Sequence, residues 1–225
     1  MDRTLRLLTT AAYIWLLCGL GVAVYVEAAN AGAVDPLTTT FSEYVHTAEG
    51  ARLVGVAMLA VGSGALAAAA ALRLTGAVLA GRLVALTGVG LGLLAVFPQE
   101  PVGEPLTWHG LIHRHVALLI FAALPAAGFT LGKAGRLVAA AALGLLGLFV
   151  ATFLVDGLHG ISGLVERAFL LLDLALLALL ARRARPRGYE RRSRRTTPRT
   201  TSGATMAAAS TSTAQPPKPG SPPWS

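Results

Sequence analysis

Apolar residues gather in six runs along the chain, and short polar segments separate these runs. A helix needs about 20 mostly apolar residues to cross roughly 30 Å of bilayer hydrocarbon, and each run reaches or approaches that length. The strands of a transmembrane β-barrel would instead alternate apolar and polar residues over short segments. The pattern therefore predicts an all-α fold, a polytopic transmembrane helical bundle of six spans over residues 1–181. The apolar runs cover residues 7–26, 53–72, 76–96, 115–131, 137–155 and 163–181.

The first run could also be read as a cleaved signal peptide, because small residues at positions 29 and 31 follow it. The apolar core of a signal peptide is about 7–15 residues long. This run is longer and includes the aromatic residues Tyr13, Trp15 and Tyr25. We therefore expect it to be retained as the first membrane span.

The composition agrees with a membrane protein. Only 13% of the residues are charged and 54% are hydrophobic, whereas about a quarter of the residues in a soluble domain are charged. The single cysteine, Cys18, lies within the first apolar run. One cysteine excludes an intramolecular disulfide and a zinc site built from several cysteines.

The chain beyond the last run has a different composition and is predicted to be a separate, disordered tail, residues 182–225. Nine of the 19 lysines and arginines fall between Arg182 and Arg199, and Thr, Ser, Ala and Pro dominate after them. Such a segment has no apolar periodicity with which to build a core. A basic cluster just beyond a span is typical of contact with membrane lipids that have anionic headgroups, so no nucleic acid is expected as a partner. The sequence carries no signal for an oligomeric state.

The basic residues also predict the orientation. Six spans place both termini on one side of the membrane, and 16 of the 19 basic residues fall on that side. Cytoplasmic loops carry the excess of Lys and Arg, so we expect a multi-pass cell-membrane protein with both termini in the cytoplasm. The basic residues on the opposite side are Arg52, Arg114 and Arg167.

The polar segments on the opposite side contain all five histidines and most of the acids. The segment between the third and fourth runs is the richest, and Thr107 is expected to cap a helix that starts at Trp108. Groups of this kind are expensive near lipid unless they find partners, so we expect a shared polar cluster drawn from several segments. Its candidate members are Glu43, His46, His109, His113, His159 and Glu166.

A metal site is the sharper alternative for two of these residues. His109 and His113 are four residues apart and share one helix face, which lets two imidazoles bind one divalent ion. Neither the HExxH nor the HxxEH pattern occurs, and a carboxylate or a third histidine would have to come from another loop. No cofactor is predicted, and no residue is assigned a catalytic role.

Asp173 stands near the middle of the sixth run. A charged group at that depth is costly and tends to face the bundle interior. Glu166 lies seven residues earlier, on nearly the same face and about 10 Å away along the axis. The two carboxyls are expected to line a polar groove, or Asp173 to be protonated or bonded to a hydroxyl.

Several short motifs occur in a recognisable order: SEYVH, FPQEP, TWHGLIH and GLVER. Across residues 7–181 the chain resembles the family of uncharacterised bacterial and archaeal membrane proteins known as domain of unknown function 998 (DUF998). The resemblance implies a multi-span membrane protein and supplies no reaction. The positions that carry it are Ser42, Glu43, Tyr44, Phe97, Pro98, Thr107, Gly110, His113 and Glu166.

Three classes of function stay open. We favour a non-enzymatic lipid-binding, sensory or accessory membrane factor with an outward-facing His/Glu cluster. The first alternative is a membrane-embedded hydrolase or transferase, with or without a metal, which would need these side chains to converge in one pocket. The second is a small transporter that uses Asp173, although no internal repeat typical of transporters is found.

Overall fold

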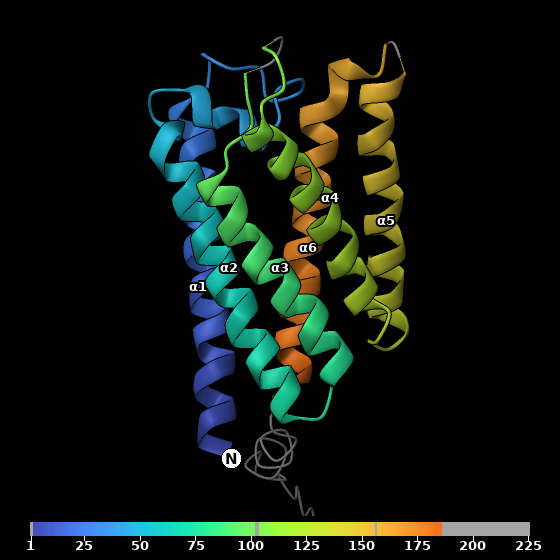
Figure 1. The fold of residues 1–225 in the computed structure, drawn as a ribbon. Helices are drawn as coiled ribbons and strands as arrows, with labels where there is room; N and C mark the ends of the chain where they lie inside the picture. Colours follow the sequence, from blue (N-terminus) through green and yellow to red (C-terminus); the bar gives the residue numbers. More distant parts are fainter. Residues whose placement is uncertain (1, 102–103, 156, 186–225) are drawn as a thin grey trace, which may run out of the picture. The chain divides into compact units, whose positions relative to one another are not determined.

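The computed structural model describes residues 2–101, 104–155 and 157–185. It contains six long helices, α1 to α6, and two short 3-10 helices, η1 and η2 (Figure 1). Of the predicted tail, only residues 182–185 are described. Helix α6 extends two residues beyond the expected boundary and includes Arg182 and Arg183. The elements are α1 (Asp2–Ala29), η1 (Phe41–His46), α2 (Gly50–Leu74), α3 (Val78–Val96), α4 (Trp108–Gly128), α5 (Lys133–Leu154), η2 (His159–Ile161) and α6 (Ser162–Arg183).

Five of these helices, α1 to α5, are long and apolar enough to cross a membrane. The 22 residues of α6 are also long enough, at about 1.5 Å of rise per residue. However, α6 carries charged groups near both ends and one near its middle, so its composition alone does not mark it as a span. These charged residues are Glu166, Arg167, Asp173, Arg182 and Arg183.

The helices run alternately up and down, so the connections gather at two ends (Figure 1). The connections α1–α2, α3–α4 and α5–α6, which contain η1, the FPQEP motif and η2, meet at one end. We call this the loop end. The start of α1, the two tight turns and the end of α6 lie at the other end, which we call the terminal end.

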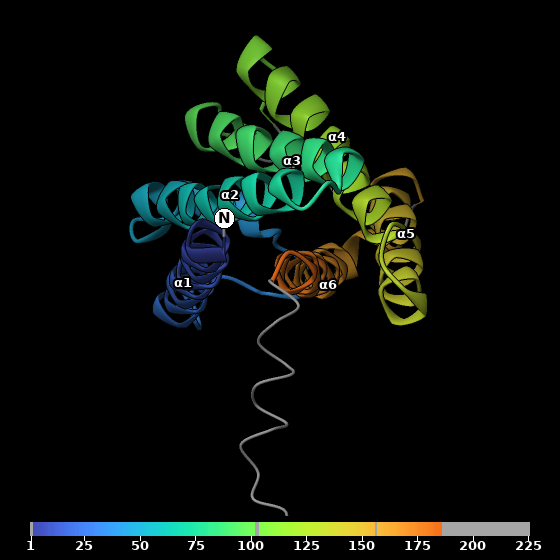
Figure 2. The ribbon, with the colours of Figure 1, turned by 90° about the horizontal axis from the view of Figure 1, so that it is seen from below.

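Helices α1 to α4 follow one another side by side, and α6 packs between α1 and α5 (Figure 2). Alanines make up most of the buried face of α2 in the terminal half, including Ala65, Ala68, Ala69 and Ala71. Small side chains let neighbouring helix backbones approach closely, which is how helices associate when lipid removes the hydrophobic driving force.

The main core fills the terminal half of the bundle. Its large members include Leu72 on α2, Val84 on α3, Leu124 on α4 and Leu176 and Leu180 on α6, each no more than 2% exposed. A smaller core around Phe41 and Tyr44 lies at the loop end. Between the two cores the helices do not pack fully, and a cavity remains there.

Candidate functional site

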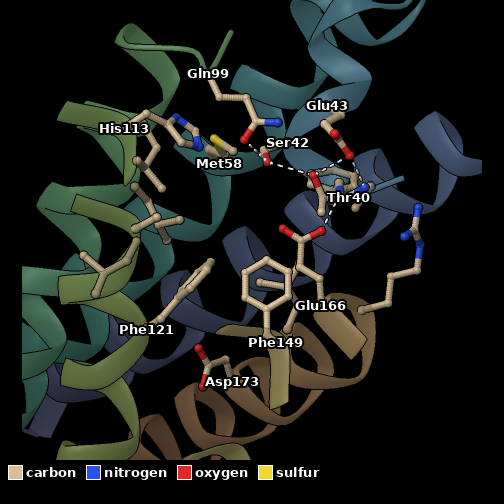
Figure 3. A pocket seen from close by; sticks show the side chains of 18 of the residues that line it. Thr40, Ser42, Glu43, Met58, Gln99, His113, Phe121, Phe149, Glu166 and Asp173 are labelled. Atoms are coloured by element: carbon tan, nitrogen blue, oxygen red, sulfur yellow. Dashed lines mark hydrogen bonds between the residues drawn. The ribbon is translucent and has the colours of Figure 1, made fainter. Parts of the chain in front are cut away.

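A cavity of about 940 Å³ lies in the loop-end half of the bundle, and residues from all six long helices line it (Figure 3). Most of its wall is apolar, with Leu, Phe, Val and Ala side chains. The polar residues concentrate towards the loop end, and Asp173 lies deeper. On each helix the lining stops at the packed core, and the deepest lining positions are Gly19, Val61, Thr87, Leu124, Leu146 and Leu177.

The start of α6 is held against the segment that precedes η1. The backbone N–H of Leu164 donates to the carbonyl of Leu37 at 3.1 Å. The hydroxyl of Ser162 donates to the carbonyl of Thr38 at 2.6 Å. These contacts join residues more than 120 positions apart, so they fix where the first helical turn of α6 lies.

Glu166 belongs to the same junction. Its side chain is 4% exposed, and its Oε2 accepts a hydrogen bond from the backbone N–H of Phe41. Glu166 therefore caps the first residue of η1 across the bundle, while the rest of its carboxyl group lines the cavity (Figure 3).

Arg167 joins three elements beside the cavity. Its guanidinium forms an ion pair with Glu27 at the end of α1, with Nη2 and Oε1 2.8 Å apart. It also donates to the carbonyl of Thr39 at 2.8 Å and to the hydroxyl of Tyr44 at 3.0 Å. The Tyr44 hydroxyl in turn donates to Glu27 at 2.9 Å. Burial and the hydrogen bond with Glu27 raise the pKa of Tyr44 above its usual value, so the hydroxyl keeps its proton at neutral pH.

Glu43 and Ser42 each form hydrogen bonds with other residues at the loop end. The Glu43 carboxylate accepts from the backbone N–H of Thr40 at 2.5 Å and from its hydroxyl at 2.8 Å. This is a capping arrangement at the start of η1. The hydroxyl of Ser42 donates to the Gln99 side chain at 3.0 Å, which links η1 to the FPQEP segment.

Glu100 caps the start of α4. One carboxylate oxygen accepts hydrogen bonds from the hydroxyl and the backbone N–H of Thr107 and from the backbone N–H of Gly110. A side chain on Gly110 would overlap this carboxylate, which explains a glycine in the TWHG motif. The hydrogen bond from the Thr107 hydroxyl, with the backbone donors, lowers the pKa of Glu100 to about 2. As predicted, Thr107 is the N-cap of α4, and its hydroxyl accepts from the N–H of His109 at 3.2 Å.

The histidines of α4 have different surroundings. His113 is 5% exposed, and its Nδ1 lies 2.8 Å from the carbonyl oxygen of Phe97, which requires the proton to be on Nδ1. His109 instead stacks on Trp108, with ring centroids 3.6 Å apart, and faces Phe97 at 5.8 Å. The two imidazoles therefore make separate contacts, one with the backbone and one with aromatic rings.

Of the six residues expected to form a polar cluster, four line the cavity: Glu43, His113, His159 and Glu166. His46 and His109 do not line it. In the part of the chain that the structure describes, no hydrogen bond joins either glutamate to a histidine, and no three His, Cys, Asp or Glu side chains come together as metal ligands would. The four residues share a cavity, and each takes its hydrogen bonds or ring contacts from other neighbours.

Asp173 lies deeper in the cavity than the other polar lining residues of α6, one helical turn from the packed core. It is 7% exposed and lines the cavity. Its Oδ1 is enclosed and has no hydrogen-bond partner among the described residues. The hydroxyls of Thr87 and Thr152 donate to the carbonyls of Leu83 and Phe149, not to Asp173.

The candidate cluster named from the sequence does not include Glu27 and Gln99, which line the cavity, or Tyr44, whose hydroxyl donates to Glu27. Glu27 directly follows the first apolar run, and Arg167 is one of three basic residues on the acidic side. Those two signals indicate a charge pair in retrospect, but they do not identify which acid Arg167 reaches.

The helices, their apolar outer surfaces and the buried polar groups are those of a multi-pass membrane protein. The chain belongs to the DUF998 family, whose model matches residues 9–183 and is described as a protein of unknown function. The match covers α1 from Thr9 to the end of α6, so it includes the cavity and both ends of the bundle. A search of curated proteins found no match, and neither did a search of solved structures.

Proposed function

We propose that this protein is a non-enzymatic, six-span protein of the cell membrane that binds a lipid-like amphiphile in the cavity between its helices. The observation that carries the proposal is the separation of apolar and polar residues along the cavity wall. Hydrocarbon side chains surround a space of about 940 Å³, and polar groups gather at the loop end. Ligand sites of this size are typically apolar with a few placed polar groups.

The sixth span is α6. Its charged groups do not require the helix to leave the membrane, because each has a place where it is tolerated. Glu166 and Arg167 bind partners at the loop end, and Asp173 faces the cavity. Arg182 and Arg183 are in the last turn, where long basic side chains reach the headgroups.

With six spans, both termini lie on one side, and the excess of basic residues on that side favours the cytoplasm. The loop end then faces outwards, and the cavity with it. The basic composition of the sequence after α6 favours contact with anionic headgroups of the inner leaflet.

The lining residues also favour a lateral connection between the cavity and lipid. Val24 on α1 and Leu171 on α6 line the cavity, and each is 58% exposed. Exposure of this extent in the lining favours an opening of the cavity at these two residues. An amphiphile in the outer leaflet could move its chain through this opening without crossing water.

The geometry gives less support to the two alternatives. An enzyme needs a base, a nucleophile and a stabilising group aimed at one point. Here Glu43 and Glu166 accept hydrogen bonds from backbone N–H groups, and His113 donates to a carbonyl. A transporter needs a route to the other side, but Leu124, Leu176 and Leu177 close the floor of the cavity.

The proposal is tested by closing the cavity. Ala117 on α4 lines it, whereas Ala122 on the same helix is exposed and does not. Ala117→Trp fills space inside, and Ala122→Trp adds the same side chain to the lipid-facing surface. Native mass spectrometry of protein extracted from membranes should show a bound amphiphile on the wild type and on Ala122→Trp, and at least ten-fold less on Ala117→Trp. Equal occupancy in both variants, or none on the wild type, contradicts amphiphile binding.

A further inference from the structure

Acidic residues outnumber basic ones around the cavity. The acids that line it are Glu27, Glu43, Glu100, Glu104, Glu166 and Asp173, and the arginines are Arg114 and Arg167. Arg167 is already bound to Glu27, and Arg114 is exposed on the loop-end turn of α4. Among the described residues, the deep part of the cavity therefore has a carboxyl group and no arginine or lysine to compensate its charge.

Asp173 is that carboxyl group. It lies seven residues beyond Glu166, which corresponds to about 10 Å along α6. Asp173 is only 7% exposed, its Oδ1 has no hydrogen-bond partner among the described residues, and the residue lines the cavity. A buried polar atom without a partner is costly, and a buried carboxylate without a cation is more so. A ligand in the cavity that brings a positive charge beside the carboxylate would offset the cost of the buried charge.

The neighbouring wall suits a cation that carries a hydrocarbon chain. Phe121 on α4 and Phe149 on α5 line the same space, and Figure 3 shows the Asp173 carboxyl group directed towards it. Aromatic rings attract ammonium groups through their negative faces, most strongly where water is excluded. Leu170 and Leu174 on α6 offer apolar surface to the attached chain.

We propose that the ligand of this cavity is an amine-bearing amphiphile. Its ammonium group binds the Asp173 carboxylate, and its hydrocarbon chain packs against the apolar wall. The inference rests on the proposed function and specifies its ligand. Glu166 stands on the route from the loop end to Asp173 and presents a second carboxyl group to an entering cation. The negative charge of the cavity thus selects a cationic ligand, and the apolar wall binds the hydrocarbon chain of that ligand.

Three probes with the same dodecyl chain test the assignment: dodecylamine, dodecanol and dodecyl methyl ether. Binding of each to the purified full-length protein in nanodiscs is measured by native mass spectrometry over a range of concentrations. We expect dodecylamine to bind at least ten-fold more tightly than the ether, with dodecanol between them. Asp173→Asn should weaken amine binding at least ten-fold and leave ether binding unchanged.

The outcomes separate the two proposals. If no probe binds, or if Ala117→Trp leaves the binding of all three unchanged, amphiphile binding in the cavity is wrong. If the ether binds and the amine binds no better than the ether, the cavity takes amphiphiles but does not select an amine. Equal affinity for the amine and the alcohol, or an unchanged amine affinity in Asp173→Asn, also overturns the ammonium–Asp173 contact. The wild-type protein alone, measured with the three probes, distinguishes these cases even if a variant fails to fold.

Discussion

Arg167 on α6 and Glu27 on α1 form an ion pair, with Nη2 and Oε1 2.8 Å apart, although they are 140 residues apart in the sequence. The same guanidinium bonds to the carbonyl of Thr39 and the hydroxyl of Tyr44. One side chain therefore ties the first and last long helices to the connection that precedes α2.

Arg167→Gln should lower the free energy of unfolding by roughly 1.5–3 kcal/mol, the contribution of a hydrogen bond to a charged group. We expect no more than this because both partners are partly exposed, which screens the charge pair. The measurement is thermal or denaturant unfolding in detergent. Arg52→Gln is the matched control, since it removes an exposed arginine at the same end of the bundle.

A double-mutant cycle with Glu27→Gln separates the ion pair from the other contacts of Arg167. Residues in direct contact show a coupling energy of about 0.5–3 kcal/mol in such cycles. Additive effects of the two substitutions would mean that the pair contributes nothing and that Thr39 and Tyr44 account for the loss.

Gly163 allows α6 to begin beside the backbone of the first loop-end connection. A Cβ at this position would lie 2.6 Å from the carbonyl oxygen of Pro36 and would also overlap that of Thr39. Gly163→Ala should therefore cost about 1–3 kcal/mol, as other overpacking substitutions do. Gly160→Ala, three residues earlier, has open space around it and should change stability by no more than about 0.5 kcal/mol. Two equal effects would show that the contact between α6 and residues 36–39 is loose.

The Glu100 carboxylate should stabilise the FPQEP segment down to low pH. Its pKa in the folded protein is about 2, below the usual 4.5, because hydrogen bonds from Thr107 and from backbone N–H groups favour the charged form. A lowered pKa means that the stabilisation is complete above pH 4.5 and is lost as the pH falls from 4.5 towards 2. The difference in melting temperature between wild type and Glu100→Gln should be constant above about pH 5 and shrink below about pH 4.5. A difference that is unchanged down to about pH 2.5 would contradict the assigned role.

Cysteine labelling tests the proposed orientation. In a Cys18→Ala background, single cysteines replace Ala48 at the loop end, Thr4 near the start of α1 and Thr200 in the basic tail. A membrane-impermeant maleimide added to intact cells should label the cysteine at position 48 and not those at positions 4 and 200. Labelling at position 4 alone or at position 200 alone would mean an odd number of spans, and therefore that α6 or another helix does not cross.

The helices could be predicted from the sequence because each is an apolar run bounded by polar residues, and the start of α4 could be predicted from Thr107. The grouping of the histidine-containing connections at one end followed from the alternation of the spans. The contacts within that end could not be predicted. Phe41 and Glu166 are 125 residues apart, and their bond depends on how α6 is placed among five other helices.

The sequence also left the role of the motif residues open. An acidic side chain next to a helix end can take part in catalysis, bind a metal ion or cap the helix. Glu100 and Glu43 both act as caps here. His113 was singled out by its spacing from His109, yet its imidazole donates a hydrogen bond to the backbone carbonyl of Phe97 at the end of α3. Spacing along a helix predicts which side chains share a face, and it does not predict which backbone groups lie opposite.

The packed floor of the cavity has an electrical consequence. Along α3 the cavity reaches Thr87, and the remaining helix to Val78 is about 14 Å long. In the proposed orientation, water that enters an unoccupied cavity from the loop end would be at the potential of the outer solution, so the membrane voltage would fall across this remaining layer and not across the usual 30 Å or so of hydrocarbon. The field there would be about twice as strong as in the surrounding bilayer, because the layer is about half as thick. A resting voltage would therefore act most strongly on the leucines and alanines beneath Asp173.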